Sequence, residues 1–426
     1  MNKQKSGNLL AIIVMILLFG MISFVTNLAS PMGDVLKNQF GVANWMGTLG
    51  VFANFIAYAV MGIPAGNLLQ KRGYKFTALA AVAVGFTGVG VQTIAGLLTG
   101  NLAFGIYLLG AFIAGFSMCM LNIVVNPMLN KLAGGGNRGN QLVQVGGSFN
   151  SLMGTATIML TGLLLGDIAK AQISQIFPLM FTALAIFAIA FAVVFFTKIP
   201  ENPNVGVKAV EEKSQYGPMS FRHFVLGAAA IFIYVGVEVG IPNLLNDWLI
   251  DPKAVGISTG VAGMVTGTYW LLMLVGRLLG AALGAKVSAK TMLTVVSGVG
   301  LALVLGAMFL PQSEVLLPVF KGTAGFGLAE VPVNAALLVL CGLCTSVMWG
   351  GIFNLAVEGL GKYTEKGAGI FMAMVCGGGI LPLLQNYVVD LKGYLPSYWV
   401  VVAGLAFLLY YALVGSKNVN KDIPTE

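Results

Sequence analysis

One acidic side chain lies in the middle of a long apolar segment. Glu238 is about fifteen residues into the run 223–249, whereas the other acidic residues, of fifteen in all, fall in loops, in tails or near the ends of such runs. A charge at the centre of a membrane helix costs at least about 2.5–3.5 kcal/mol, so it normally faces a cavity and acts on an ion, a proton or a substrate. We predict that Glu238 is a cation-coupling carboxylate. The alternative is a protonated carboxyl that is hydrogen-bonded to a neighbouring helix.

Amide side chains recur at helical spacing on two other apolar segments. Asn122 and Asn126 are four residues apart and share one helix face. A second stripe repeats every three or four residues and consists of Gln141, Gln144, Ser148, Ser151 and Thr155. Amides donate and accept hydrogen bonds without carrying a charge, which suits the hydroxyls of a sugar. The predicted substrate-binding amides are Asn27, Asn122, Asn126, Gln141, Gln144 and Asn150. Helix–helix hydrogen bonding is the alternative, and it is the role expected of the serines and Thr155.

Two tryptophans lie deep in apolar segments, where a ring face is available to the C–H side of a sugar. They are Trp270 and Trp349, and Trp270 shares a helix face with Arg277. We predict that both contact substrate, with packing inside a helix bundle as an equal alternative. Trp248 and Trp399 lie nearer segment ends, as in the aromatic belt of a membrane protein. Arg277 is assigned to the end of its segment, so no cationic side chain is expected at mid-membrane.

Three motifs match enzyme or metal signatures but lie in the wrong context. A GxGxxG pattern begins at Gly134, yet no strand precedes it, as a dinucleotide site requires. Cys341 and Cys344 form a CxxC on an apolar run without a second ligand pair. His223 is the single histidine, which excludes a multi-histidine metal site and a Ser-His-Asp triad. The sequence therefore predicts no cofactor and no metal.

The elements that position these residues are long apolar runs. Hydrophobic residues are 58% and charged residues 9% of the 426 residues, against about 45–50% and 25% in soluble proteins. A membrane-spanning helix needs about 20 apolar residues, and an outer-membrane barrel would alternate apolar with polar. Twelve runs qualify, near residues 8–30, 44–69, 76–98, 102–129, 141–166, 174–197, 223–249, 256–285, 291–311, 331–357, 365–389 and 395–416. The sequence predicts an all-α membrane protein with twelve transmembrane helices.

The basic residues indicate how these helices are oriented. With both termini inside, eighteen of the 23 lysines and arginines face the cytoplasm. The outer side receives only Lys37, Lys170, Lys253, Lys321 and Lys392. Cytoplasmic loops carry such an excess, so we predict a multi-pass protein of the inner (plasma) membrane with both termini cytoplasmic. The net charge of +8 then reflects the inner face beside the lipid bilayer, and no nucleic acid partner is expected. We expect a monomer.

The chain divides into two similar halves around its longest polar stretch. We predict an N-terminal six-helix bundle over 1–198, a cytoplasmic linker over 199–222 and a C-terminal six-helix bundle over 223–426. Residues 66–75 after the second run and residues 276–286 at the end of the eighth run echo each other. Two six-helix repeats related by an axis along the membrane normal are typical of the major facilitator fold.

Five short segments indicate a particular family within the major facilitator fold. They are residues 62–75, 122–127, 148–151, 234–238 and 377–379, which lie in both halves. Together they resemble the fucose–galactose–glucose:proton symporter family of the major facilitator superfamily. The resemblance implies uptake of a monosaccharide by cation symport and alternating access. The sugar would be neutral, a hexose, deoxyhexose or N-acetylated amino sugar, because no mid-membrane lysine or arginine is expected to hold an anionic substrate.

Two positions depart from the family pattern. Fucose-permease-like members carry a carboxylate in helix one and another in helix four, where this chain has Asn27 and Asn122. An amide does not titrate near neutral pH, so the coupling role passes to Glu238. The family favours a proton, while the two asparagines leave a sodium-coupled or an uncoupled sugar carrier as alternatives. An integral membrane enzyme is a more distant one, because it would need several intramembrane ionisable groups.

Overall fold

The membrane spans account for most of the structure, a computed structural model that describes residues 9–26, 49–98, 100–165, 177–201, 216–321 and 325–425. In this part of the chain, ten helical segments are long and apolar enough to cross a membrane. One of them, Phe52–Ala95, has 44 residues, about twice the length of one span. Helix α5 (Gly136–Leu165), which carries the polar stripe, is a further 30-residue helix. Counting Phe52–Ala95 as two spans and adding α5 brings the described spans to the predicted twelve.

The break inside α3 (Leu49–Ala95) separates the second and third spans. Gly73 has φ 82°, a left-handed conformation that glycine adopts without strain. Two backbone N–H groups that follow the break donate to the carboxylate of Glu201, from Tyr74 at 2.7 Å and from Lys75 at 2.8 Å. An anion at a helix N-terminus satisfies donors that have no partner within the helix. The chain after α6 thus caps the third span.

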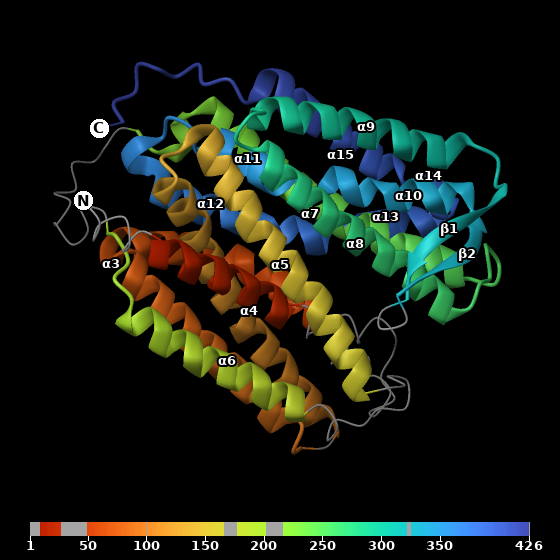
Figure 1. Cartoon of the computed structure of the whole chain (residues 1–426), viewed down its shortest axis with the longest axis horizontal. Coiled ribbons are helices and arrows are strands. Elements are labelled where there is room, and N and C mark those ends of the chain that lie inside the picture. The colour runs from red at the N-terminus through yellow and green to blue at the C-terminus, as the bar shows by residue number, and fades with distance from the viewer. Residues whose placement is uncertain are drawn as a thin grey trace.

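The first half of the chain comprises Leu9–Thr26, α3, α4 (Gly100–Leu132), α5 and α6 (Phe177–Phe196). Most of it lies in the lower part of Figure 1, in red to yellow-green, and α5 runs from there into the upper part. Small residues let α3 and α4 pack closely, since a Cβ at Gly88 would lie 2.6 Å from the Ala114 nitrogen. In a membrane, where lipid is as apolar as leucine, such close packing is a main source of helix association.

The second half begins at α7 and lies in the upper part of Figure 1, in green to blue. Its helices are α7 (Arg222–Ile250), α8 (Thr259–Leu283), α9 (Ala289–Phe309), α10 (Val333–Thr345), α11 (Met348–Val357), α12 (Thr364–Ala373), α13 (Gly377–Lys392), α14 (Tyr394–Ser397) and α15 (Trp399–Tyr410). Three of the predicted spans are each interrupted once or more. The span predicted over 331–357 consists of α10 and α11 from residue 333 onward, and the span predicted over 365–389 consists of α12 and α13 around a short 3₁₀ turn. α14 and α15 are followed by a π turn, Tyr411–Gly415.

A β-hairpin follows α9 and was not predicted from the sequence. β1 (Glu314–Phe320) pairs antiparallel with β2 (Phe326–Pro332), and Phe320 lies opposite Phe326. The Phe320 N–H donates to the Thr268 hydroxyl of α8 at 2.9 Å, so the hairpin is docked on a membrane helix. The all-α class is confirmed for the spans, and the hairpin adds a small sheet to one of their connections.

The two belt tryptophans differ in environment. Trp399 is 52% exposed and packs edge-on against Phe309, as expected of a belt residue. Trp248 is only 3% exposed, so its assignment to the belt was wrong. The reason is the central place of α7, which is in contact with α8, α10, α11, α13 and α15. Even the end of this helix is therefore covered by protein.

The two halves meet at one end of the molecule, around a second cavity. We call it the basic end, because Lys131 lies there beside Tyr74 and Glu365. The Asn130 amide of α4 is hydrogen-bonded to Asn354 of α11, whose own amide donates to Asn140 of α5 at 3.3 Å. These contacts, with others between α3 and α12 and between α5 and α8, close the basic end.

Candidate functional site

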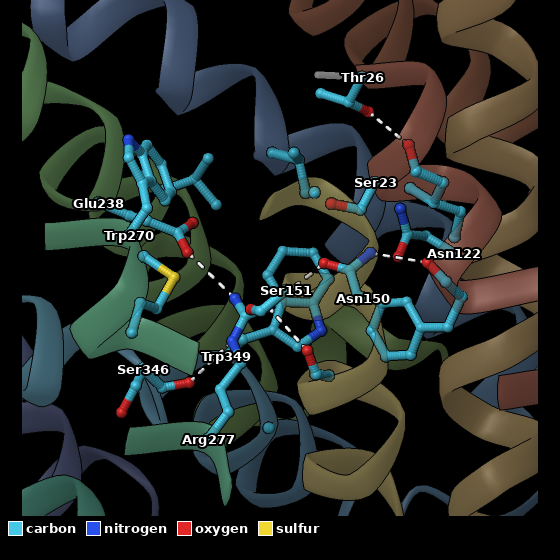
Figure 2. A pocket seen from close by; sticks show the side chains of 18 of the residues that line it. Ser23, Thr26, Asn122, Asn150, Ser151, Glu238, Trp270, Arg277, Ser346 and Trp349 are labelled. Carbon is cyan, nitrogen blue, oxygen red and sulfur yellow. Dashed lines mark hydrogen bonds and ion pairs between the residues drawn. The ribbon is translucent and has the colours of Figure 1, made fainter. Parts of the chain in front are cut away.

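A cavity of about 210 Å³ lies between the two halves (Figure 2). The first half lines it with Leu9–Thr26, α3, α4 and α5, and the second half with α7, α8, the junction of α10 and α11, and Val375. Kinked and interrupted helices meet here, and non-helical backbone inside a membrane is tolerated where it is buried in protein or lines a cavity. A central cavity at the interface of two repeats is where facilitator folds bind substrate.

Glu238 lines this cavity and is paired with Arg277. One carboxylate oxygen lies 3.2 Å from the guanidinium, and the two side chains are only 13% and 11% exposed. The same oxygen accepts the Tyr234 hydroxyl at 2.8 Å. The Tyr269 hydroxyl donates to the backbone carbonyl of Glu238 at 3.2 Å. The carboxylate is thus held by an ion pair and a hydroxyl, which satisfies its charge inside the protein.

The expectation that no cationic side chain lies at the centre was wrong, because Arg277 lines the cavity although it lies near the end of its helix. The residue lies two turns after Trp270, so both side chains point to one face of α8, and both line the cavity. The long aliphatic part of arginine carries the charged group several ångströms from its own backbone position. A helix position near the segment end is therefore compatible with a guanidinium in the central cavity.

Arg277 also contacts the first half of the chain. Its Nη1 donates to three acceptors of α5, namely the Gly147 carbonyl at 3.1 Å, the Asn150 amide oxygen at 3.3 Å and the Ser151 hydroxyl at 2.8 Å. Its Nε donates to the Ser346 carbonyl at 3.3 Å, at the junction of α10 and α11. Figure 2 shows the guanidinium in the midst of these groups. The planar fork of arginine permits such a multiple contact.

Three of the predicted amides line the cavity. Asn122 donates to the Tyr58 hydroxyl at 2.9 Å, and Asn150 donates to the Phe19 carbonyl at 2.7 Å. Gln144 donates to the Val347 carbonyl of the second half at 3.0 Å. Ser151 and Thr155, which were expected to act between helices, also line it.

The other predicted amides lie elsewhere. Asn126 is fully buried beside the cavity, where its amide oxygen accepts the Trp349 indole N–H at 3.1 Å. Gln141 donates to the Ala281 carbonyl of α8 at 3.1 Å. Both lie outside the cavity lining. Asn27 lies outside the described residues, and its neighbour Thr26 lines the cavity.

Both predicted tryptophans border the cavity. Trp270 packs edge-on against Tyr269, with ring centroids 5.4 Å apart, and Trp349 packs edge-on against Tyr234 at 6.3 Å. The two tyrosines that hold Glu238 thus also hold the tryptophans. Tyr234 was missed as a site residue, although its place four residues before Glu238 puts both on one helix face.

The three motifs set aside from the sequence have structural roles. Gly134, Gly135 and Gly136 have positive φ and make the turn between α4 and α5. Cys341 and Cys344 are free and buried in α10. His223 is hydrogen-bonded through Nε2 to the Glu358 carbonyl at 2.9 Å. Among the residues that the structure describes, no cluster of three metal-ligating side chains is found.

The architecture and the central cavity define a polytopic transporter, and comparison with known proteins identifies its family. Residues 10–382 match the family model of the Major Facilitator Superfamily, so the chain belongs to that superfamily. It is 28% identical over 408 residues to a glucose/galactose transporter of Brucella abortus, covering 94% of this chain and 93% of the relative. It is 22% identical over 404 residues to the L-fucose-proton symporter of Escherichia coli, covering 88% and 86%.

Solved structures support the same fold. The crystal structure of the Escherichia coli fucose:proton symporter matches with a TM-score of 0.78 at 20% identity, over 96% of this chain and 100% of that chain. A proton:xylose symporter matches with a TM-score of 0.72 at 13% identity, over 98% of both chains. The major facilitator fold expected from the two six-helix repeats is confirmed.

Proposed function

We propose that this protein takes up a neutral monosaccharide, a hexose, deoxyhexose or N-acetylated amino sugar, by cation symport and alternating access. The observation that carries the proposal is the cavity between the two halves, in which amides, hydroxyls and two tryptophans surround one paired acid and base. Polar uncharged groups match sugar hydroxyls, and the indole faces match the C–H side of a sugar ring.

The pairing of charges supports a neutral substrate. Glu238 and Arg277 cancel each other, and no further charged side chain lines the cavity in the described part of the chain. While Glu238 is ionised, an anionic substrate would have to displace it from Arg277, which would leave the carboxylate buried without a partner. The expectation that no cationic side chain lies at the centre was wrong. The prediction of a neutral substrate now rests on the pairing of that cation, Arg277, with Glu238.

The relatives support a sugar as the substrate class. The Brucella abortus relative is named a glucose/galactose transporter and the Escherichia coli relative an L-fucose-proton symporter. Both align along most of the chain, so the comparison covers both walls of the cavity. The identity of the sugar is left open among the three classes named above.

For coupling, we propose that Glu238 carries the transported cation. It is the carboxylate among the described residues that line the cavity, and an intramembrane carboxylate is a functional site by default. The name of the fucose relative favours a proton. A sodium-coupled carrier is the alternative, because Asn27 and Asn122 replace the family's two carboxylates, and an uncoupled carrier follows if Glu238 serves only to hold Arg277.

We propose the inner membrane as the location, with both termini cytoplasmic and the basic end facing the cytoplasm. The excess of lysine and arginine on one side of the membrane supports this orientation. A division into bundles 1–198 and 223–426 with a linker over 199–222, and a monomeric state, remain part of the proposal. The lipid bilayer, a sugar and a cation are the partners that it requires.

Uptake into proteoliposomes tests the proposal. The purified protein is supplied with a panel of labelled sugars under an imposed pH gradient, a sodium gradient or neither. We expect accumulation of at least one neutral sugar. With one proton per sugar, 100 mV supplies about 2.3 kcal/mol, enough for roughly fifty-fold accumulation. Competition by sugar phosphates as strong as by free hexoses would refute a neutral substrate, and accumulation driven by sodium alone would refute the proton.

A further inference from the structure

Arg277 connects the two walls of the cavity. It is paired with Glu238 of α7 in the second half, and it donates to Gly147, Asn150 and Ser151 of α5 in the first half. Gly147 has no side chain, and a Cβ there would lie 3.6 Å from Cδ of Arg277. The guanidinium therefore lies directly against the α5 backbone. A single side chain joins the carboxylate to the opposite wall.

The acceptors on α5 are also groups that a substrate would use. Asn150 and Ser151 line the cavity, and their amide and hydroxyl oxygens accept from Nη1 of Arg277. An amide and a hydroxyl are common partners of sugar hydroxyls. Arg277 and a sugar in the cavity thus share the same neighbours, so a change in the position of the guanidinium changes what the sugar meets.

The position of the guanidinium depends in turn on the charge of Glu238. The titratable or charged groups that contact this carboxylate are Tyr234 on its own helix and Arg277 on α8, and Tyr269 of α8 donates to the backbone carbonyl of Glu238. From the other walls, the described lining presents amides, hydroxyls, apolar side chains and Trp349. Arginine does not lose its proton in proteins. When a cation neutralises Glu238, Arg277 therefore keeps its charge and loses its ionic partner.

We propose that Arg277 is the positioning residue that couples the cation at Glu238 to the sugar, an inference that rests on the proposed function. In the empty carrier, ionised Glu238 holds the guanidinium. When a proton or another monovalent cation binds to Glu238, the guanidinium is released and donates to sugar hydroxyls beside Asn150 and Ser151. A cation at Glu238 then strengthens sugar binding, and by thermodynamic linkage the sugar strengthens cation binding by the same factor.

The pairing of Glu238 with Arg277 also fixes the net charge of the site in the empty and in the cation-loaded carrier. With Glu238 ionised and Arg277 protonated, the empty site has no net charge. One bound monovalent cation gives the loaded site a charge of plus one, since Arg277 is unchanged. An inside-negative potential then acts on the inward step of the loaded carrier and leaves the return of the empty carrier unaffected.

Three variants test the coupling in proteoliposomes: Arg277→Gln, Arg277→Lys and the double variant Glu238→Gln/Arg277→Gln. Arg222→Gln is the matched control, because Arg222 contacts Tyr410 at the start of α7, away from the cavity. Sugar affinity is measured by equilibrium exchange at high and low cation concentration. Coupling between two sites is usually about 5–150-fold, and we expect the wild type and Arg222→Gln to fall in that range.

In Arg277→Gln, we expect the affinity ratio between the two cation concentrations to fall below about twofold, together with a loss of sugar-induced current. Arg277→Lys keeps the charge but not the planar fork, so it should keep the current and show a reduced ratio. The double variant, which leaves no unpaired charge, should exchange sugar with no cation dependence. If Arg277→Gln does not fold, Arg277→Lys and the double variant decide the question.

The outcomes separate the two proposals. A wild type that transports no sugar, or whose sugar affinity ignores every cation, refutes the proposed symport. If sugar affinity depends on the cation in the wild type and the affinity ratio is unchanged in Arg277→Gln, the symport stands and the role of Arg277 is overturned. If Arg277→Gln does not fold, an unchanged ratio in both Arg277→Lys and the double variant has the same meaning. A fully retained ratio with retained current in the double variant would place the cation at another residue.

Discussion

The two walls of the cavity differ in chemistry. The wall from the first half presents amides and hydroxyls, among them Asn122, Gln144 and Ser151. The wall from the second half presents Glu238 and Arg277, and with them both tryptophans. In the family pattern the carboxylates lie in helices one and four, that is, in the first half. Under the proposed function, the first wall is suited to hydrogen bonding with a sugar, and the carboxylate that would bind the cation lies across the cavity.

The largest effect is expected from removing the charge on the second wall. In Glu238→Gln, uphill accumulation of sugar should be abolished while exchange of sugar across the membrane is retained, because the amide keeps hydrogen bonds but cannot release a proton. Counterflow and gradient-driven uptake in the same vesicles measure the two activities. Loss of binding itself would instead make Glu238 a sugar ligand, and loss of stimulation by sodium alone would make it a sodium site.

A second prediction concerns how the walls move relative to each other. A Cβ at Gly62 would lie 2.5 Å from the Ala373 nitrogen and 2.6 Å from the Gly369 carbonyl, both of them backbone atoms of α12. Gly62→Val should therefore oppose closure of the basic end. Overpacking costs about 1–3 kcal/mol, which corresponds to a population shift of roughly 5–150-fold. The cavity chemistry itself should be unchanged.

Labelling of a cysteine placed at Thr364 measures this closure, since Thr364 lines a second cavity at the basic end. Its labelling by a polar maleimide should increase in Gly62→Val. Gly90→Val is the control, because no atom lies within 4 Å of a Cβ there. Equal labelling in the two variants would show that the contact of α3 with α12 does not govern closure.

The sequence predicts the spans well because the thickness of the bilayer sets their length, whichever helices they pack against. The apolar runs 44–69 and 76–98 leave a gap that contains Gly73, where the helix indeed breaks. The cap by Glu201 was not predictable, because it comes from a segment far along the chain. The hairpin after α9 was missed, since the strand β1 has only seven residues and lies between two long apolar runs.

The candidate site was predicted in part. Glu238 stood out because a lone carboxylate at mid-span is rare. Arg277 did not, since its place near a helix end gave no sign of the direction of a long side chain. Asn126 and Gln141 share faces with Asn122 and Gln144, yet their partners are Trp349 and Ala281. A helix face lines the cavity along part of its length and packs against helices of the opposite half along the rest. Residue spacing alone does not show where the lining ends and the packing begins.

The third prediction separates these two roles among the amides of the first wall. Asn122→Ala and Gln144→Ala should each weaken sugar affinity by about five- to thirty-fold, as expected for loss of about 1–2 kcal/mol of hydrogen bonding. Gln144→Ala should also weaken closure of the basic end, because its amide donates to the Val347 carbonyl. Gln141→Ala, which lies outside the lining, serves as the control. Unchanged affinity in both cavity variants would assign them to helix packing.

The smallest effects are expected at the tryptophans of the second wall, where two kinds of substitution separate stacking from hydrogen bonding. Phenylalanine keeps an aromatic face and leucine does not, and aromatic stacking is worth about 0.5–1.5 kcal/mol. If Trp270 stacks on the sugar, Trp270→Leu should weaken affinity by roughly two- to twelve-fold while Trp270→Phe stays near the wild type.

Trp349→Phe should also weaken sugar affinity, because it removes the indole N–H that donates to Asn126. Sugar affinity measured by exchange for these three variants, with thermal stability alongside, decides between the roles. A decrease in stability with unchanged affinity would show that the rings pack the bundle, and sugar recognition would then rest on the amides of the first wall.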